Sequence, residues 1–150
     1  MSTVHAVVGT LVMLLSLAAG LWGGWAWRQG LISPLFWRLL RASQAVLVVE
    51  VLLGAGLLVT GREPARLHVL YGLLPLGVSF IAEQLRLVSA DQVLQRRGME
   101  RAREMEALPA AEQQAVVREI VTRETGVMAA SALVVFLLAL RASGVAGFIA

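Results

Sequence analysis

Four long stretches of almost continuous apolar residues dominate the pattern of hydrophobic and polar positions. They cover residues 4–27, 42–60, 67–88 and 126–142. A helix needs about 20 mostly apolar residues to cross a hydrocarbon core of about 30 Å, and each stretch approaches or exceeds that length. The pattern therefore predicts an all-α fold, a polytopic membrane four-helix bundle that forms a single membrane domain over residues 1–150.

The first stretch shares some features with a secretory signal peptide, but three observations separate it from one. No positive residue precedes it, and it is longer than the apolar region of a signal peptide. Trp22, Trp25 and Trp27 stand where small residues would mark a cleavage site. We therefore expect this stretch to remain in the mature protein as a transmembrane helix.

Residues 89–125 form the one long polar connection and predict a cytoplasmic helical hairpin between the third and fourth spans. Ser89 begins a pattern that resembles a capping box, which predicts the start of a new helix, and Pro109 suits the first turn of a second one. Because nothing stronger than Gly126 interrupts the apolar spacing that follows, we expect one continuous helix over residues 110–141. The hairpin either packs on itself or offers a docking surface to a partner.

The arginines set the expected orientation, because positive residues in short loops are retained on the cytoplasmic side of a membrane. Ten of them flank the first and third connections: Arg28, Arg38, Arg41, Arg86, Arg96, Arg97, Arg101, Arg103, Arg118 and Arg123. The other three, Arg62, Arg66 and Arg141, lie on the opposite side. We therefore expect a multi-pass protein of the cell (cytoplasmic) membrane, the inner membrane of a bacterium, with both termini extracytoplasmic.

Composition supports a membrane location and excludes several kinds of chemistry. Apolar residues make up 58% of the chain and mean hydropathy is +0.76, whereas soluble domains are roughly 45–50% apolar. The absence of cysteine excludes disulfides, thiolate metal sites and iron–sulfur clusters. All thirteen basic residues are arginines near membrane spans, so no nucleic-acid partner is expected. No motif of a soluble enzyme is present, and we expect no catalytic residues.

Two histidines form the candidate cofactor site. His5 opens the first span and His68 opens the third, so the expected topology places both at the same membrane edge and at equal depth. Gly9 and Gly72 follow them four positions later, which leaves a bare patch one turn deeper on each helix face. A flat macrocycle held between two helices needs an imidazole ligand beside such a patch. We therefore predict a bis-histidine b-type haem near the outer membrane face.

Arg62 and Arg66, in the outer loop, are expected to pair with the haem propionates through charge-assisted hydrogen bonds. Two other interpretations of the histidines stay open. Histidine is typical of membrane interfaces, where its ring has an apolar body and a polar tip, and the pair then has no ligand. Alternatively, His5, His68 and Glu63 bind a metal ion, for which zinc or copper is suited.

Glu50 is the one carboxylate well inside a predicted span, where a charged side chain is costly unless it is protonated, paired or hydrated. Counting along antiparallel spans places Glu83, Gln84 and Arg86 at a similar depth on the third span. We predict that Glu50 contacts one of these three residues and so joins the second and third helices. The open alternative is a proton relay or a substrate site at Glu50.

Two segments carry a resemblance to known sequences. HVLYGLLPLGVSFIAEQLR, from His68 to Arg86, and REIVTRE, from Arg118 to Glu124, resemble a group of small four-helix membrane proteins of GC-rich bacteria that brings no known activity. The resemblance covers about half of the chain. In general shape the chain is also similar to small membrane b-type cytochromes, which have paired histidines on two helices, although two histidines allow one haem only.

Three functions are therefore open. The protein is an electron-transfer subunit that binds haem b, a non-catalytic accessory subunit of a larger membrane complex, or a small transporter. An accessory subunit would be embedded in membrane lipid and would contact other subunits, or a second copy of itself, through its hairpin and its glycine-lined helix faces. The glycines of these faces are Gly9, Gly20, Gly23, Gly24, Gly54 and Gly56.

Overall fold

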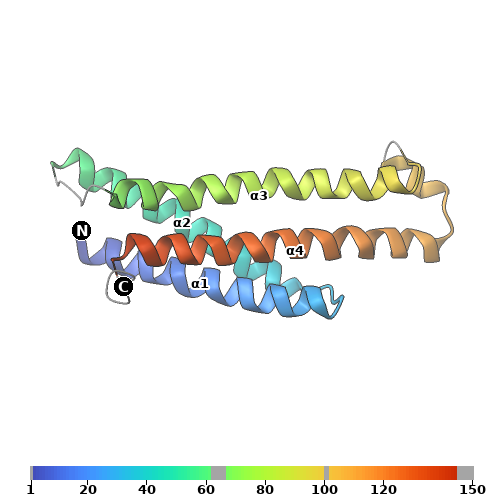
Figure 1. Cartoon of the computed structure of the whole chain (residues 1–150), viewed down its shortest axis with the longest axis horizontal. Coiled ribbons are helices and arrows are strands. Elements are labelled where there is room, and N and C mark those ends of the chain that lie inside the picture. Colours follow the sequence, from blue (N-terminus) through green and yellow to red (C-terminus); the bar gives the residue numbers. More distant parts are fainter. Residues whose placement is uncertain (1, 62–66, 100–101, 145–150) are drawn as a thin grey trace.

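The computed structural model describes residues 2–61, 67–99 and 102–144, which are almost entirely helical (Figure 1). Their helices are α1 (Ser2–Arg28), α2 (Pro34–Val59), α3 (His68–Arg96), the short 3₁₀ helix η1 (Ala102–Ala107) and α4 (Ala110–Ala142). Each of α1 to α4 is long and apolar enough to cross a membrane. The predicted all-α class, with four helices able to span a membrane, is confirmed at this level.

α2 begins well before the predicted start of the second span, and the reason lies in its first residues. The hydroxyl of Ser33 accepts a hydrogen bond from the backbone N–H of Phe36 at 3.3 Å and another from the indole N–H of Trp22 at 2.9 Å. Pro34 follows in the first turn, where its missing N–H leaves no donor without a partner. Arg41, predicted in the first connection, is therefore a residue of α2.

α3 runs through Ser89 without a break, so the predicted helix start at that residue is wrong. The Ser89 hydroxyl donates to the carbonyl of Leu85 at 2.8 Å, a bond made inside a continuing helix rather than at an N-cap. The single helix predicted over residues 110–141 is confirmed, because α4 continues through Gly126. The cytoplasmic location of the α3–α4 connection stays a prediction.

The four long helices form a bundle in which three pairs of neighbouring helices pack extensively and the fourth pair, α2 and α3, packs only slightly. α1 packs along both α2 and α4, and α3 packs along α4, whereas direct contact between α2 and α3 is slight. In Figure 1, α4 lies between α1 and α3. α1 and α3 therefore stand at diagonal corners, and any ligand held by both of them spans the interior of the bundle.

Glycines bring α1 and α4 into close contact. The side chain of Leu133 on α4 lies over Gly20 of α1, and a Cβ at Gly20 would be 3.2 Å from the Leu133 backbone nitrogen. Further along the same pair, Trp27 of α1 lies over Gly126 of α4, with its Nε1 2.7 Å from the position of a Gly126 Cβ. Any larger residue at either glycine would push the two helices apart.

Not every predicted glycine contact is present. The ring of Phe36 occupies the space beside Gly23, which confirms a close contact there, and a Cβ at Gly23 would also lie 2.9 Å from the Cβ of Ala129. At Gly24 and Gly56, by contrast, no atom of the described residues lies within 4 Å of a Cβ position. Neither glycine is in close contact with another helix among the described residues.

Three apolar clusters of buried residues stabilise the described bundle and its extension, and one of them consists of Val12, Leu47 and Val135. The core between the four helices consists of Ala19, Phe36, Leu40, Ala82, Met128, Ala129 and Ala132. A separate cluster joins the last turns of α3 to the first turns of α4 and consists of Val93, Leu94, Met99 and Val116, with Met105, Leu108 and Ile120 packed against it. The ends of α3 and α4 therefore pack on each other beyond the four-helix region.

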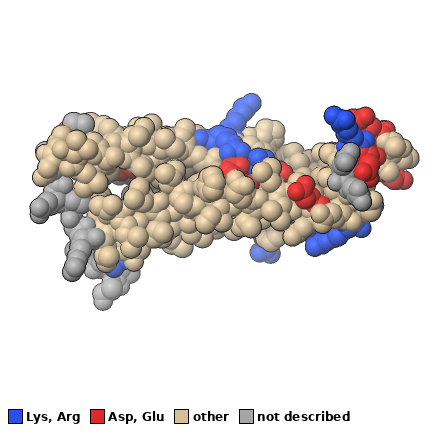
Figure 2. Space-filling view, turned by 90° about the horizontal axis from the view of Figure 1, so that it is seen from above, with Lys and Arg blue, Asp and Glu red and all other residues tan. Residues whose placement is uncertain are grey.

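The outer surface of the bundle is apolar in a way that suits lipid and not water. Leu52, Val59 and Phe80 are 66%, 88% and 67% exposed, and many other large apolar side chains are exposed with them. Figure 2 shows the charged side chains gathered toward the α3–α4 connection and largely missing from the other half of the visible face. Exposed apolar area of this extent marks a surface covered by another apolar phase, here the hydrocarbon of a membrane.

Candidate functional site

The register of α1 against α2 places Glu50 beside Gly9. The buried hydroxyls of Ser16 on α1 and Ser43 on α2 lie 2.7 Å apart in a hydrogen bond that pairs these antiparallel helices. Counting outward from this bond along both helices brings Gly9 opposite Glu50. A Cβ at Gly9 would lie 2.8 Å from Oε1 of Glu50, so the missing side chain makes room for this carboxyl group.

One turn further along, the same register places His5 beside Gly54. A Cβ at Gly54 would lie 3.4 Å from Cε1 of His5. Nδ1 of His5 lies 3.1 Å from Oε1 of Glu50, and both side chains are about four-fifths buried, at 19% and 18% exposed. The angles of this contact are not those of a hydrogen bond, and His5 Nδ1 and Glu50 Oε2 have no hydrogen-bond partner among the described residues. His5 and Glu50 therefore lie close together, but one polar atom of each side chain makes no hydrogen bond to the described residues.

His68 enters the same space from the opposite corner of the bundle. Its Nδ1 lies 3.0 Å from the carbonyl oxygen of Ala142 at the end of α4. Because a carbonyl only accepts, neutral His68 carries its proton on Nδ1 and keeps the lone pair of Nε2 free. The rings of His5 and His68 make an edge-type contact, with centroids 5.8 Å apart and planes at 73°. The sequence predicted this meeting of the two histidines at one end of the bundle.

A cavity of about 840 Å³ surrounds the two rings. Its walls are mainly apolar and come from all four long helices. The polar lining residues are His5, Thr10, Glu50, His68, Tyr71 and Ser143. Gly72 lines it with no atom of the described chain within 4 Å of its Cβ position, as expected for a bare patch facing a gap. Gly9 lines it too, but its bare patch is filled by Glu50 and does not stay open as predicted.

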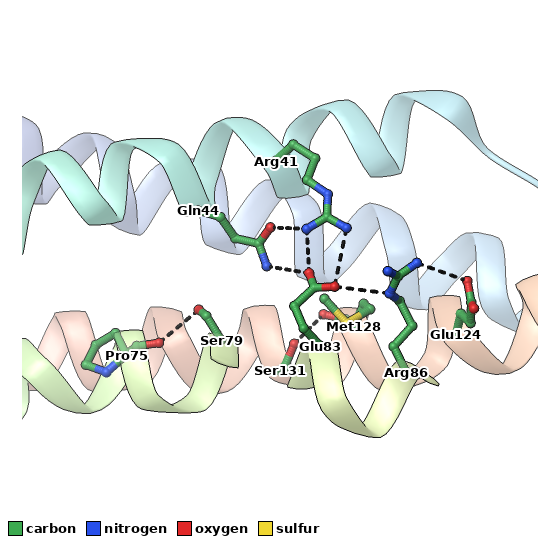
Figure 3. A network of polar contacts seen from close by, with 9 residues as sticks. All are labelled: Arg41, Gln44, Pro75, Ser79, Glu83, Arg86, Glu124, Met128 and Ser131. Carbon is green, nitrogen blue, oxygen red and sulfur yellow. Dashed lines mark hydrogen bonds and ion pairs between the residues drawn. The ribbon is translucent and has the colours of Figure 1, made fainter. Parts of the chain in front are cut away.

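A second polar group lies further along α2 and α3 and has different partners from those predicted (Figure 3). Glu83 of α3 receives hydrogen bonds from Arg41 and, at 3.0 Å, from the side-chain amide of Gln44, both on α2. Arg86 donates to Glu83 at 3.1 Å and also lies 3.6 Å from a carboxylate oxygen of Glu124 on α4. This network joins three helices through two acidic and two basic side chains, so its formal charges balance.

The prediction that Glu50 contacts Glu83, Gln84 or Arg86 is wrong. Arg41 and Gln44 are the residues of α2 that contact Glu83. Glu50 lies six positions beyond Gln44, roughly 9 Å further along the helix at 1.5 Å per residue. Gln84 is exposed on the outer face of α3. The error arose because depth was counted from a span assumed to begin at residue 42, whereas α2 begins at Pro34.

Sequence reasoning therefore missed three members of the network. Arg41 and Gln44 were read as loop and span residues, although their spacing of three places them on one helix face, and they hydrogen-bond to each other at 2.7 Å. Glu124 was placed in the polar connection, yet it lies on α4 level with Arg86. The acid at position 124 and the arginine at position 86, each near the polar end of a helix, were the available signals for this contact.

Three residues predicted to take part in ligand binding, Arg62, Glu63 and Arg66, lie outside the described residues. Among the residues that the structure describes, no group of three or more histidine and carboxylate side chains is arranged to hold a metal ion. The described site therefore offers two imidazoles and one carboxylate around an apolar cavity, with the carboxylate turned to one imidazole. No family model matches the chain, and neither a curated protein nor a solved structure matches it.

Proposed function

We propose that this membrane protein binds one b-type haem between His5 and His68 and serves as a one-electron transfer subunit. The observation that carries the proposal is the adjacent pair of imidazoles from diagonal helices, each with its Nδ1 close to an oxygen atom: Glu50 Oε1 at 3.1 Å for His5 and the Ala142 carbonyl at 3.0 Å for His68. Metal-binding histidines commonly direct one ring nitrogen to a carboxylate or backbone carbonyl and bind the metal with the other. Glu50 and the Ala142 carbonyl are acceptors of these two kinds.

The separation of the rings would allow His5 and His68 to hold one iron between them. Two imidazoles bound on opposite sides of a metal, with bonds of about 2 Å, have ring centroids about 6 Å apart. The centroids of His5 and His68 are 5.8 Å apart. The apolar cavity around them, about 840 Å³ in volume, lies in the range of pockets that bury a whole cofactor.

In this proposal the chain holds and shields the cofactor, and the haem when bound supplies reversible one-electron chemistry. The Ala142 carbonyl orients the ring of His68 through a hydrogen bond, and Glu50 lies beside the ring of His5. The open face at Gly72 would admit a flat ring system, and the cavity walls around it are mainly apolar. With two histidines in the sequence, one haem is the limit, so electrons are exchanged on one side of the membrane. By the arginine distribution that side is the outer face of the cytoplasmic membrane, with both termini extracytoplasmic.

The test is an absorption spectrum of the full chain, produced with haem supplied and purified in detergent, before and after reduction with dithionite. We expect the bands of a low-spin b-type haem and their loss in both His5→Ala and His68→Ala. Thr10→Ala is the matched control, because Thr10 lines the same cavity and its hydroxyl bonds only to the carbonyl of Ala6. A wild-type protein without haem absorption would contradict the proposal and favour an accessory subunit of a larger complex.

A further inference from the structure

A smaller cavity of about 300 Å³ borders the large one at the ends of α3 and α4. The two cavities share His68, Tyr71, Ala142 and Ser143 in their linings, so they meet around the second histidine. The smaller one adds Arg141, the last basic residue of α4. A ligand that fills the large cavity can therefore extend a peripheral group past Tyr71 to a positively charged side chain.

Arg141 is the one basic residue among the described residues that line either cavity. Its guanidinium carbon lies 5.7 Å from the centroid of the Tyr71 ring, a cation–π contact that holds the group beside the cavity. No carboxylate of the described chain lies within ion-pair distance of it, whereas Glu50, the acid of the large cavity, is turned to His5. Because no described carboxylate pairs with Arg141, the planar set of hydrogen-bond donors on its guanidinium is available to an external anion.

We infer that Arg141 binds a carboxylate of the molecule held in the large cavity, which under the proposed function is a haem propionate. Arg–carboxylate contacts are charge-assisted and often bidentate, so they fix the orientation of a ligand as well as its affinity. Ala142, the next residue, accepts the hydrogen bond of His68. The end of α4 would thus support His68 through the Ala142 carbonyl and a carboxylate of the same ligand through the side chain of Arg141.

Arg141 has two other conceivable partners, and the experiment separates them from a propionate. An arginine in the last turn of a helix interacts favourably with the negative end of the helix dipole, and an interfacial arginine attracts anionic lipid headgroups. Neither of these roles depends on the charge of the bound cofactor. Esterifying both propionates of haem removes that charge while leaving the iron and the ring system in place.

The full chain, purified without haem into nanodiscs of zwitterionic lipid, is titrated with haem b and with its dimethyl ester. We expect Arg141→Gln to weaken haem b binding about tenfold or more, the usual effect of losing a hydrogen bond to a charged group. Binding of the ester should be unchanged, and Arg141→Lys should restore part of the affinity for haem b. Arg118→Gln, which removes an exposed arginine from the far end of the same helix, is the control.

Each other result overturns the inference. Equal weakening of both ligands would mean that Arg141 acts only on the stability of α4, and no weakening would mean that it does not contact the ligand. A loss that appears only in nanodiscs with anionic lipid would assign Arg141 to headgroups. The inference rests on the proposed function, and the wild type distinguishes the two failures. If the wild type binds both ligands and Arg141→Gln has no effect, only the inference is wrong. If the wild type binds neither ligand, the proposed function is wrong as well.

Discussion

The two halves of the bundle differ in how the side between α2 and α3 is closed. In the network half, around Arg41, Glu83 and Arg86, side chains cross from α2 to α3 and on to α4. In the pocket half, around His5 and His68, residues of α2 and α3 instead line the two sides of a cavity of about 840 Å³. The same pair of helices is thus bridged at one end and separated at the other.

This difference shows how a membrane bundle can keep a cavity without losing its structure. Lipid tails are as apolar as the cavity walls, so no hydrophobic force drives α2 and α3 together in the pocket half. In the network half, separation of the helices would instead leave charged groups in hydrocarbon, which is costly. The network therefore fixes the distance between α2 and α3 at one end and leaves the other end free to take a ligand.

The largest effect is expected from filling the pocket half. Gly72→Leu adds a side chain where no described atom lies within 4 Å, so the helix is not strained but the space for a flat cofactor is lost. We expect haem affinity to fall at least about a hundredfold, by the loss of more than about 2.7 kcal/mol of binding, with helicity and thermal unfolding unchanged. Titration with haem, followed by absorption, measures this.

Gly77→Leu is the control for that change. Gly77 lies on the same helix, also has open space at its Cβ position, and is exposed outside the cavity lining. The Gly77→Leu variant should bind haem with the affinity of the wild type. Equal losses in the two variants would show that the pocket half does not hold the cofactor.

A smaller effect, on stability, is expected from breaking the network. Glu83→Ala removes the acceptor shared by Arg41, Gln44 and Arg86. Hydrogen bonds to charged groups contribute about 1.5–3 kcal/mol, and partial exposure of these side chains places the expected loss near 2 kcal/mol. Denaturant unfolding in bicelles measures it. Gln84→Ala, at the exposed neighbouring position, should change the free energy of unfolding by less than about 0.5 kcal/mol.

The smallest effect tests how tightly the network half is packed. Gly23→Ala places a methyl group against the ring of Phe36 and the Cβ of Ala129. Such overpacking lowers the free energy of unfolding by about 1–3 kcal/mol, and because only one methyl group is added we expect the lower end of that range. Gly24→Ala, one residue along, meets no described atom within 4 Å and should be neutral or slightly stabilising. If the two variants unfold alike, the close packing of α1 on α2 and α4 is not what stabilises this half.

The parts of the molecule predicted from sequence are those set by properties of single segments. Hydropathy and length were sufficient to predict the four helices. His5 and His68 each lie at the start of a span on the same side of the bundle, which was sufficient to predict that their rings lie near each other. Continuity of α4 followed from the absence of a strong helix breaker between Ala110 and Ala142.

The parts not predicted depend on the register between helices. That Glu50 meets His5, and that Gly9 is filled by Glu50, follows from the pairing of α1 with α2 at the Ser16–Ser43 hydrogen bond. A shift of one turn along either helix would give Glu50 another partner, and hydropathy is nearly the same in both registers. Apolar stretches of this length determine that helices cross the membrane but not which residues stand opposite each other.

The glycine contacts between α1 and α4 have a mechanical consequence. Leu133 fits over Gly20 and Trp27 over Gly126, so one side chain from each helix enters a recess on the other at two levels. Sliding α4 along α1 would have to withdraw both side chains at once, so these contacts oppose relative movement of the two helices. The slight contact between α2 and α3 is the weakest side of the bundle, so we expect the cavity to widen by separation of these two helices while the α1–α4 contact stays in place.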